Sequence, residues 1–299
     1  MESLTYERVG SHGERLIAAA LVHLSPNSEY PPPRHLLRDL GVDIEHVEVG
    51  RARGWIPMRT AVQLHDGTGR IGAVAALIDC VGGAIAGPLV APGWMATADL
   101  ALELFGPWSE GWIRAEGTTL RSGRSTVVLQ VDLVTESDAQ TCGRGYLTFA
   151  VLPGRDGNPI MHEEQPTGRR SLGDTDGGRL AILECLGATA EGTGAVRSPI
   201  TAYSRNTLDA MHGGAVALLM DAAAEDALHA IEPAVPFRAT ALSLTYIARN
   251  TIGPVFVQSE VASIDECIAA TTVEVRDEGA ERTTAHGWIR YALNEEERI

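Results

Sequence analysis

The sequence predicts an α+β protein built from two copies of one domain, each an antiparallel sheet curled around a central helix. Two helical segments, Arg70–Ala86 and Met211–Leu228, are apolar nearly all round, and a helix without a polar face is buried. One strand-like stretch precedes each segment and four follow it, separated by turn residues. The two halves also match each other at a fixed separation, which indicates an internal duplication.

The duplication keeps one register without gaps from Gly50 to Tyr146. An offset of 142 residues (221 − 79) places Asp221 on Asp79, so each buried helix carries a carboxylate about two turns from its start. The same offset relates Gly50 to Gly192, Pro57 to Pro199, Gly72–Ala75 to Gly214–Ala217, Leu100 to Leu242, Leu102 to Leu244, Gly111 to Gly253, Val131 to Val273, Gly145 to Gly287 and Tyr146 to Trp288. Two copies of one domain facing each other is the simplest architecture.

Composition excludes several classes of function. A chain of 299 residues holds two domains of ordinary size, and its net charge of −15 disfavours nucleic-acid partners and a polybasic membrane anchor. All 24 basic residues are arginine, and the absence of lysine excludes Schiff-base enzymes, protein kinases and Walker-A nucleotidases. The four cysteines have no metal or redox spacing, so we expect reduced packing residues, no bound metal and a cytoplasmic protein.

Neither a signal peptide nor a membrane span is expected. The N-terminal stretch lacks the apolar core that a signal peptide needs. The longest apolar runs are interrupted by Asp and too short to cross a bilayer, so we expect no membrane partner.

Four regions are expected along the chain. Residues 1–46 form an N-terminal helical arm outside the repeat, with helices at Ser11–Leu24 and 34–41. The first domain, 47–153, has a strand at Trp55–Leu64, the buried helix, and strands at Met95–Phe105, Trp112–Arg121, Thr126–Val134 and Cys142–Leu152. Residues 154–186 form a linker rich in Gly, Pro and charge. The second domain, 187–299, has a strand at Ile200–Arg205, the helix from His212, and strands near Arg238–Ile247, Val255–Ile264, Ile268–Arg276 and Arg282–Leu293.

One motif points to a different fold. Residues Gly67–Gly72 read G-x-G-x-x-G between a strand and a helix, a pattern typical of dinucleotide-binding folds. Such folds alternate strands and helices, whereas four strands follow in succession here. The second half also keeps only the last of the three glycines. We therefore expect no nicotinamide or flavin cofactor.

The most specific pattern is Asn206-x5-His212-Gly213-Gly214, followed by Asp221 on the same helix. Glycines at a helix start let a ligand approach free backbone N–H groups, where the helix dipole favours a developing oxyanion. Taken alone, His212 reads as a capping or core histidine, Asn206 as a turn residue and one buried aspartate as an accident of packing. Their combination favours a site, since a buried carboxylate is costly unless it is paired, hydrated or used.

On a strand–helix–four-strand frame, this pattern resembles the PaaI-like acyl-CoA thioesterases of the hotdog superfamily. The match covers both halves, most clearly residues 197–293, so the chain is similar to a fused, tandem double hotdog. The resemblance implies that a helix-start glycine supplies an oxyanion-binding N–H and that an aspartate acts as base or nucleophile. It further implies that Asn and His bind and polarise the thioester and that a later Ser or Thr orients the water. It implies no cofactor beyond coenzyme A within the substrate, and we expect a homo-oligomer.

Neither half carries the whole set. The second half has Asn206, His212, Gly213 and Asp221, with Ala239 at the Ser/Thr position; the first has Leu64, Arg70 and Ile71 in place of Asn, His and Gly, but keeps Asp79 and Thr97. Gly213 and Asp221 are eight residues apart (221 − 213), about 12 Å along one helix. Oxyanion donor and attacking group must both lie within about 3–3.5 Å of one carbonyl, so one helix cannot supply both.

Two antiparallel helices side by side can do so, each offering its start to the aspartate of the other. One composite site then holds Asp79, Thr97, Asn206, His212 and Gly213, with Gly214 in the substrate-binding region, and a degenerate second site surrounds Asp221. Arg121 and Arg124 are candidates to bind the phosphates of coenzyme A, as are Arg169 and Arg170. Cys80 reads as a packing residue.

We therefore predict hydrolysis of an acyl-CoA to free acid and CoA at one site per chain, with Asp79 as its acid–base residue. The alternative is a non-catalytic acyl-CoA-binding or scaffold protein with the same fold. A dehydratase of the hotdog superfamily is disfavoured, because the second half lacks an obvious hydratase-type Asp-x4-His pair.

Overall fold

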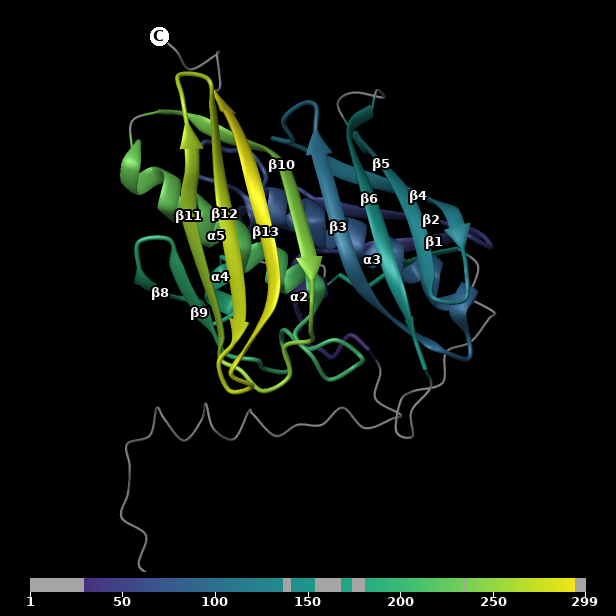
Figure 1. Cartoon of the computed structure of the whole chain (residues 1–299). Coiled ribbons are helices and arrows are strands. Elements are labelled where there is room, and N and C mark those ends of the chain that lie inside the picture. The colour runs from purple at the N-terminus through teal and green to yellow at the C-terminus, as the bar shows by residue number, and fades with distance from the viewer. Residues whose placement is uncertain (1–29, 137–140, 154–167, 174–180, 234, 294–299) are drawn as a thin grey trace, which may run out of the picture.

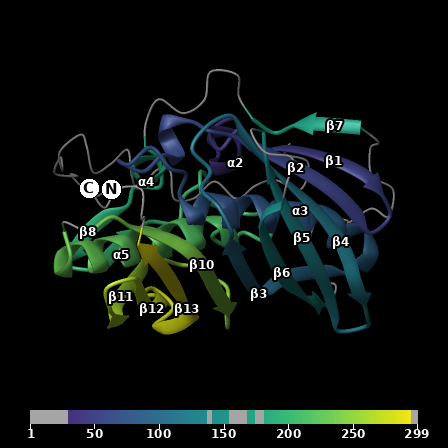
Figure 2. The ribbon, with the colours of Figure 1, turned by 90° about the horizontal axis from the view of Figure 1, so that it is seen from above.

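The computed structural model describes residues 30–136, 141–153, 168–173, 181–233 and 235–293. Within these residues thirteen strands form one sheet in the order β7-β1-β2-β4-β5-β6-β3-β10-β13-β12-β11-β9-β8, with every pair antiparallel. Two long helices, α3 (Ile71–Val90) and α5 (Gly213–Ile231), lie on one face of this sheet (Figures 1 and 2). The helix expected at Ser11–Leu24 lies outside the described residues.

The two halves of the chain share one order of elements. Before α3 lie α2 (Leu36–Asp39), β1 (Asp43–Glu48), β2 (Arg51–Pro57) and a 3-10 turn (Thr60–Val62); after it lie β3 (Trp94–Leu104), β4 (Trp112–Ser122), β5 (Thr126–Thr135) and β6 (Thr141–Leu152). The second half has α4 (Ile182–Cys185), β8 (Thr189–Gly192), β9 (Ala195–Ser198), α5, β10 (Phe237–Tyr246), β11 (Val255–Ile264), β12 (Ile268–Asp277) and β13 (Arg282–Leu293). Strand β7 (Gly168–Ser171) lies between the halves in sequence and pairs with β1. The offset of 142 residues maps the start of α3 onto the start of α5 (71 + 142 = 213).

The halves meet where β3 pairs with β10 in the middle of the sheet (Figure 1). The register places Leu100 opposite Leu244, Ala101 opposite Ser243, and Leu102 opposite Leu242. Ala101 and Ser243 are equivalent under the 142-residue offset, so a local two-fold axis passes between them. This axis sets α3 and α5 antiparallel, with the start of each beside the middle of the other.

The sheet curls around α3, and α3 therefore contacts every strand from β1 to β6. Its side chains are mostly buried, and the facing strands alternate buried and partly exposed residues; on β5 the buried set includes Val127, Leu129, Val131 and Leu133. The expected hotdog-type frame, a helix wrapped by an antiparallel sheet, is therefore present.

Helix α3 corrects one expectation about membranes. It is 20 residues long and is apolar enough to cross a bilayer by length and composition alone. Asp79 does not interrupt it, and its length reaches what a span requires. In this fold it is a core helix, with most of its side chains buried.

Glycines let the two helices approach each other. A Cβ added at Gly72 would lie 2.8 Å from the Ala217 carbonyl oxygen and 2.9 Å from the Leu218 Cα, both on the backbone of α5. At the equivalent Gly214, an added Cβ would lie 2.5 Å from the Ala76 Cβ. The close contact between α3 and α5 therefore needs glycine at both helix starts.

We expect Gly72→Ala to destabilise the protein by about 1–3 kcal/mol, because the methyl group would push the two helix backbones apart. Gly83→Ala is the matched control on the same helix, since its Cβ would meet only the Met95 Cε, at 3.9 Å. Alanine is the better helix former, so this control should be neutral or more stable by up to about 1 kcal/mol. Urea denaturation measures both changes, and equal stability of the two variants would contradict the packing described.

The strand predicted at Ile200–Arg205 is wrong. The strand of the second half is β9, which ends at Ser198, immediately before Pro199. Proline has no N–H to donate to a sheet, and the chain then folds back, with the Ser204 and Arg205 N–H groups donating to the Thr201 carbonyl. These turns carry the chain towards the start of α5.

Other boundaries also differ from the expected ones. The strand expected at Trp55–Leu64 lies earlier, because β2 covers Arg51–Pro57 and a 3-10 turn follows. Strand β1 begins at Asp43, inside the region expected to be a helical arm. The expected linker contains regular structure, namely β7 and α4.

Candidate active site

A cavity of about 700 Å³ lies where the two halves meet. Its wall includes Asp79, Cys80 and Gly83 from α3, Thr97 from β3, the segment 206–208 before α5, and the start of α5 itself. The carboxylate of one half and the helix start of the other therefore face the same space.

Asp79 is buried in the middle of α3, with 7% of its surface exposed. The Thr97 hydroxyl donates to its Oδ1 at 2.7 Å, and the His212 Nδ1 lies 3.7 Å from its Oδ2. Burial raises the pKa of Asp79 to about 6, although the Thr97 hydroxyl and the Gly214 N–H both act to lower it. At neutral pH the group is a carboxylate with a pKa suited to accepting a proton.

His212 caps the start of α5, and this contact fixes its tautomer. Its Nδ1 accepts the Gly214 N–H at 3.0 Å, so the proton of the neutral ring is on Nε2. Burial lowers the pKa of His212 to about 4, so the ring is neutral near pH 7. Among the described residues the Nε2–H has no hydrogen-bond acceptor, and His212 lines the cavity.

Gly213 is the first residue of α5, and its N–H likewise has no acceptor within the described parts of the chain. A Cβ built on Gly213 would lie 2.8 Å from the Asp79 Oδ2 and 3.1 Å from the Tyr246 hydroxyl oxygen. The Tyr246 hydroxyl donates to the Gly213 carbonyl at 2.8 Å and so holds this end of the helix. The helix start thus lies directly beside the carboxylate, in a space that a larger side chain would fill.

Asn206 lies in the loop that leads into α5. Its Oδ1 accepts the Leu208 and Ala210 N–H groups at 2.9 and 3.2 Å. This pairing orients the amide so that Nδ2 remains available, without an acceptor in the part of the chain that the structure describes, and Asn206 lines the cavity.

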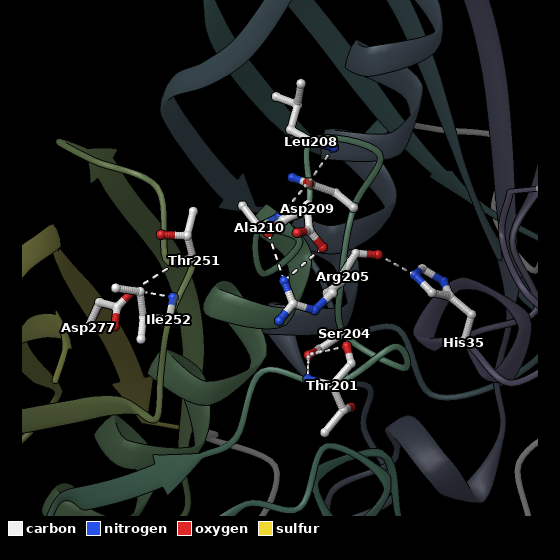
Figure 3. A network of polar contacts seen from close by, with 11 residues as sticks. His35, Thr201, Ser204, Arg205, Leu208, Asp209, Ala210, Thr251, Ile252 and Asp277 are labelled. Atoms are coloured by element: carbon white, nitrogen blue, oxygen red, sulfur yellow. Dashed lines mark hydrogen bonds and ion pairs between the residues drawn. The ribbon is translucent and has the colours of Figure 1, made fainter. Parts of the chain in front are cut away.

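Polar contacts on both sides hold this loop in place (Figure 3). The Arg205 guanidinium donates to the carbonyl and the carboxylate of Asp209, both at 2.8 Å. His35, from the N-terminal arm, lies 2.8 Å from the Arg205 carbonyl through its Nε2. In Figure 3 the His35 side chain points to Arg205 in this loop from a separate segment of the chain.

The structure therefore brings together five of the residues expected in the composite site: Asp79, Thr97, Asn206, His212 and Gly213. The first two come from one half and supply a carboxylate held by a hydroxyl. The other three come from the second half and supply three hydrogen-bond donors. Gly214 is close by, but its N–H points to His212 and Asp79. Burial raises the pKa of the Cys80 thiol, which agrees with a packing role.

Arg121 and Arg124 lie elsewhere. Both are exposed, at the end of β4 and in the turn before β5, and neither is among the residues that line the cavity. Arg170, Arg249 and Arg282 line it instead, and the Arg282 Nη2 donates to the Arg249 carbonyl at 2.9 Å. No sequence motif marks Arg249 or Arg282; their position follows from where β10 ends and β13 begins.

The equivalent position in the other half is occupied by an ion-pair cluster. Asp221 accepts the Gly72 N–H at 3.3 Å, as the two-fold axis requires. Arg70 replaces the histidine, with its Nη1 2.7 Å from Glu225 and 3.7 Å from Asp221. Burial raises the pKa of Asp221 while Arg70 opposes the shift. Under the 142-residue offset, Leu64 and Arg70 stand in place of Asn206 and His212, so this position lacks their side-chain amide and imidazole donors.

The described residues contain no cluster of three or more His, Cys, Asp and Glu side chains that could hold a metal ion. The wall of the cavity carries a carboxylate, a hydroxyl and neutral donors together with the side chains of Arg170, Arg249 and Arg282.

The fold is similar to that of solved hotdog proteins. The TesB protein of Mycobacterium avium subspecies paratuberculosis superposes with a TM-score of 0.61 at 13% identity, over 87% of this chain and 98% of that one. The 12:0-ACP thioesterase from Umbellularia californica gives 0.55 at 10% identity, over 82% and 94%. A hotdog-fold protein of unknown function from Alicyclobacillus acidocaldarius gives 0.55 at 10% identity, over 87% and 97%. The chain therefore has a hotdog-type α+β fold.

Residues 208–284 match the thioesterase superfamily. This segment runs from the loop before α5 into β13 and includes His212, Gly213 and Asp221. The comparison with curated proteins gave no match. Over this segment the chain is similar to the thioesterase superfamily, in agreement with the resemblance stated from the sequence, and the match supports thioester hydrolysis as the general reaction.

Proposed function

We propose that the protein hydrolyses an acyl-CoA thioester to a free acid and CoA, at one composite site shared by two PaaI-like hotdog halves of a duplicated chain. The observation that carries this proposal is the cavity where Asp79 and Thr97 of one half face three free donors of the other. A carboxylate opposite free donors is what acyl transfer to water requires.

In this mechanism the thioester carbonyl oxygen accepts the Gly213 N–H, with the His212 Nε2–H and the Asn206 amide as further donors. These fixed dipoles stabilise the oxyanion that forms as the carbonyl carbon becomes tetrahedral. The Asp79 carboxylate takes a proton from the attacking water, or attacks the carbonyl carbon itself to form a mixed anhydride that a water molecule then hydrolyses to the free acid. The CoA sulfur leaves as the C–S bond breaks and takes up the proton held by Asp79 or, in the second route, a proton from water. Thr97 holds the carboxylate in position for either route.

The composition of the cavity wall supports separate positions for the acyl group and for the coenzyme A part of the substrate. Along α3 beyond Asp79 it is apolar, with Gly83, Ala84 and Pro88 facing Trp94 and Met95, as a site for an acyl group requires. On the side of the segment after β10 it carries Arg249 and Arg282, whose charges suit the phosphates of coenzyme A. We assign the acyl group to the first part and the coenzyme to the second.

The test is a panel of acyl-CoA thioesters of differing chain length and aromatic content, with release of free thiol as the readout. We expect hydrolysis of part of the panel, with the Asp79→Asn protein as the negative control. Binding of the panel without thiol release would instead favour an acyl-CoA-binding or scaffold protein that keeps the fold without turnover.

The rate of hydrolysis should depend on the protonation of Asp79. Both routes need the ionised carboxylate, so kcat should rise through about pH 6, where the buried group loses its proton. Burial lowers the pKa of His212 to about 4, so this residue stays neutral over the same range and its titration adds no second inflection to the pH–rate profile. A profile that is flat from pH 5 to 8 while chemistry limits the rate would count against Asp79 as base or nucleophile.

A further inference from the structure

Tyr30 contributes a buried hydroxyl group to the cavity. Its side chain lines the cavity wall, and its ring packs edge-on against His35, with 5.0 Å between the ring centroids. The hydroxyl oxygen is buried and has no hydrogen-bond partner among the described residues. A buried donor without an acceptor costs stability, and such groups in folded proteins usually have a reason.

The ring contacts place Tyr30 near the donors of the site, because the His35 ring lies 6.4 Å from the His212 ring, measured between ring centroids. The donors available to a carbonyl oxygen all come from residues 206–213, whereas Tyr30 comes from the N-terminal arm. Burial raises the pKa of Tyr30 well above its usual value, and Cys80 adds to this more than Asp79 does. The phenol is therefore a neutral donor in the cavity wall, next to the group that contains His212 and Asp79.

Part of the cavity wall is apolar. Leu37, Ile44, Phe149 and Leu172 line the same cavity as Tyr30, and their side chains suit a hydrocarbon chain. None of these four side chains can accept a proton from the Tyr30 hydroxyl. A bound acyl group that carries an oxygen at this point would supply the missing acceptor.

We propose that Tyr30 contacts the acyl group of the substrate, and that its hydroxyl donates to a hydroxyl or oxo oxygen on a carbon close to the thioester carbonyl. The inference rests on the proposed function and narrows it to hydroxyacyl or oxoacyl thioesters. Asp79 and the helix start carry out hydrolysis, and Tyr30 selects which acyl group is held there.

The test compares acyl groups of one length: hexanoyl-CoA, 3-hydroxyhexanoyl-CoA and 3-oxohexanoyl-CoA. We expect the wild-type protein to favour an oxygen-bearing substrate by about 10- to 100-fold in kcat/KM, the range that one buried hydrogen bond supplies. Tyr30→Phe should remove this preference by slowing only the oxygen-bearing substrate. Tyr291→Phe is the matched control, since the buried Tyr291 hydroxyl lies near Asp221 in the other half, and it should keep the preference.

Three results would overturn the inference: a wild-type protein without the preference, an unchanged preference in Tyr30→Phe, or an equal loss for all three substrates. Failure of the proposed function gives a separate result, because the wild-type protein would then release no thiol from any thioester. In that case calorimetric binding to Asp79→Asn, with and without Tyr30→Phe, still compares the same three ligands. Loss of the preference in the double variant supports the contact, and equal affinities throughout exclude it.

Discussion

Asp79→Asn is expected to lower kcat for thioester hydrolysis by about 10²–10⁴-fold, the range associated with loss of a general base. Asparagine keeps the shape of the side chain and can still accept from Thr97 at 2.7 Å, but it can neither take a proton from water nor attack the carbonyl. Substrate binding should change little, because the donors around the carbonyl oxygen belong to residues 206–213. The measurement is steady-state kinetics on the best substrate of the panel.

The matched control is Asp221→Asn, which alters the equivalent carboxylate of the other half. Asp221 lies in the ion-pair cluster with Arg70 and Glu225 and away from the donors of the active half, so we expect kcat within a few-fold of wild type. Loss of activity with Asp221→Asn alone would reverse the assignment of the two halves.

Folding of the Asp79→Asn variant can be checked by its stability. Burial raises the pKa of Asp79 in the folded protein to about 6, above its ordinary value of 3.8. The protonated group therefore favours the folded state, and this contribution is lost as pH rises through about 6. Asn cannot ionise, so the variant should be more stable than wild type above pH 6, by up to about 3 kcal/mol, and should lose this advantage below pH 4.

The second large effect is expected from Arg70→Ala. The Arg70 guanidinium neutralises Asp221, whose side chain is only 4% exposed. Removing one partner of a buried pair leaves an uncompensated charge, and we expect a loss of about 2–4 kcal/mol in the free energy of unfolding at pH 8. The loss should be smaller at pH 5, because burial raises the pKa of Asp221 and protonation removes the charge.

The double variant Arg70→Ala/Asp221→Asn is the control for this prediction. It removes both charges, so it should recover most of the stability lost in the single variant. Denaturant unfolding at both pH values measures these differences. Equal stability of Arg70→Ala and wild type at pH 8 would show that Asp221 carries no charge there.

Much of the frame could be predicted because it depends on periodicity and repetition. Helices α3 and α5 are apolar nearly all round. The strands from β3 to β6 and from β10 to β13 alternate apolar and polar residues, and turn residues separate one strand from the next. The proximity of Gly213 to Asp79 could be predicted from one distance, because Gly213 and Asp221 are too far apart on one helix to serve one carbonyl. In the structure Gly213 lies beside Asp79 instead.

The rest depends on contacts that no local pattern records. Arg249 and Arg282 reach the cavity because β10 ends and β13 begins beside it, and neither stands in a motif. Tyr30 and His35 precede the stretch over which the 142-residue offset holds, so the comparison of the two halves in sequence gives them no counterpart. The strand expected at Ile200–Arg205 is absent because turn-forming hydrogen bonds to Thr201 follow Pro199.

The most direct test of a single composite site is the stoichiometry of ligand binding. Isothermal titration of the Asp79→Asn protein with its best acyl-CoA substrate counts the sites on each chain, because the variant binds without turnover. With Arg70 and Glu225 occupying the second position, we predict one molecule bound per chain. Two molecules per chain, or one that still binds after the Asn206 and His212 donors are removed, would contradict a single site formed by Asp79 of one half and the α5 start of the other.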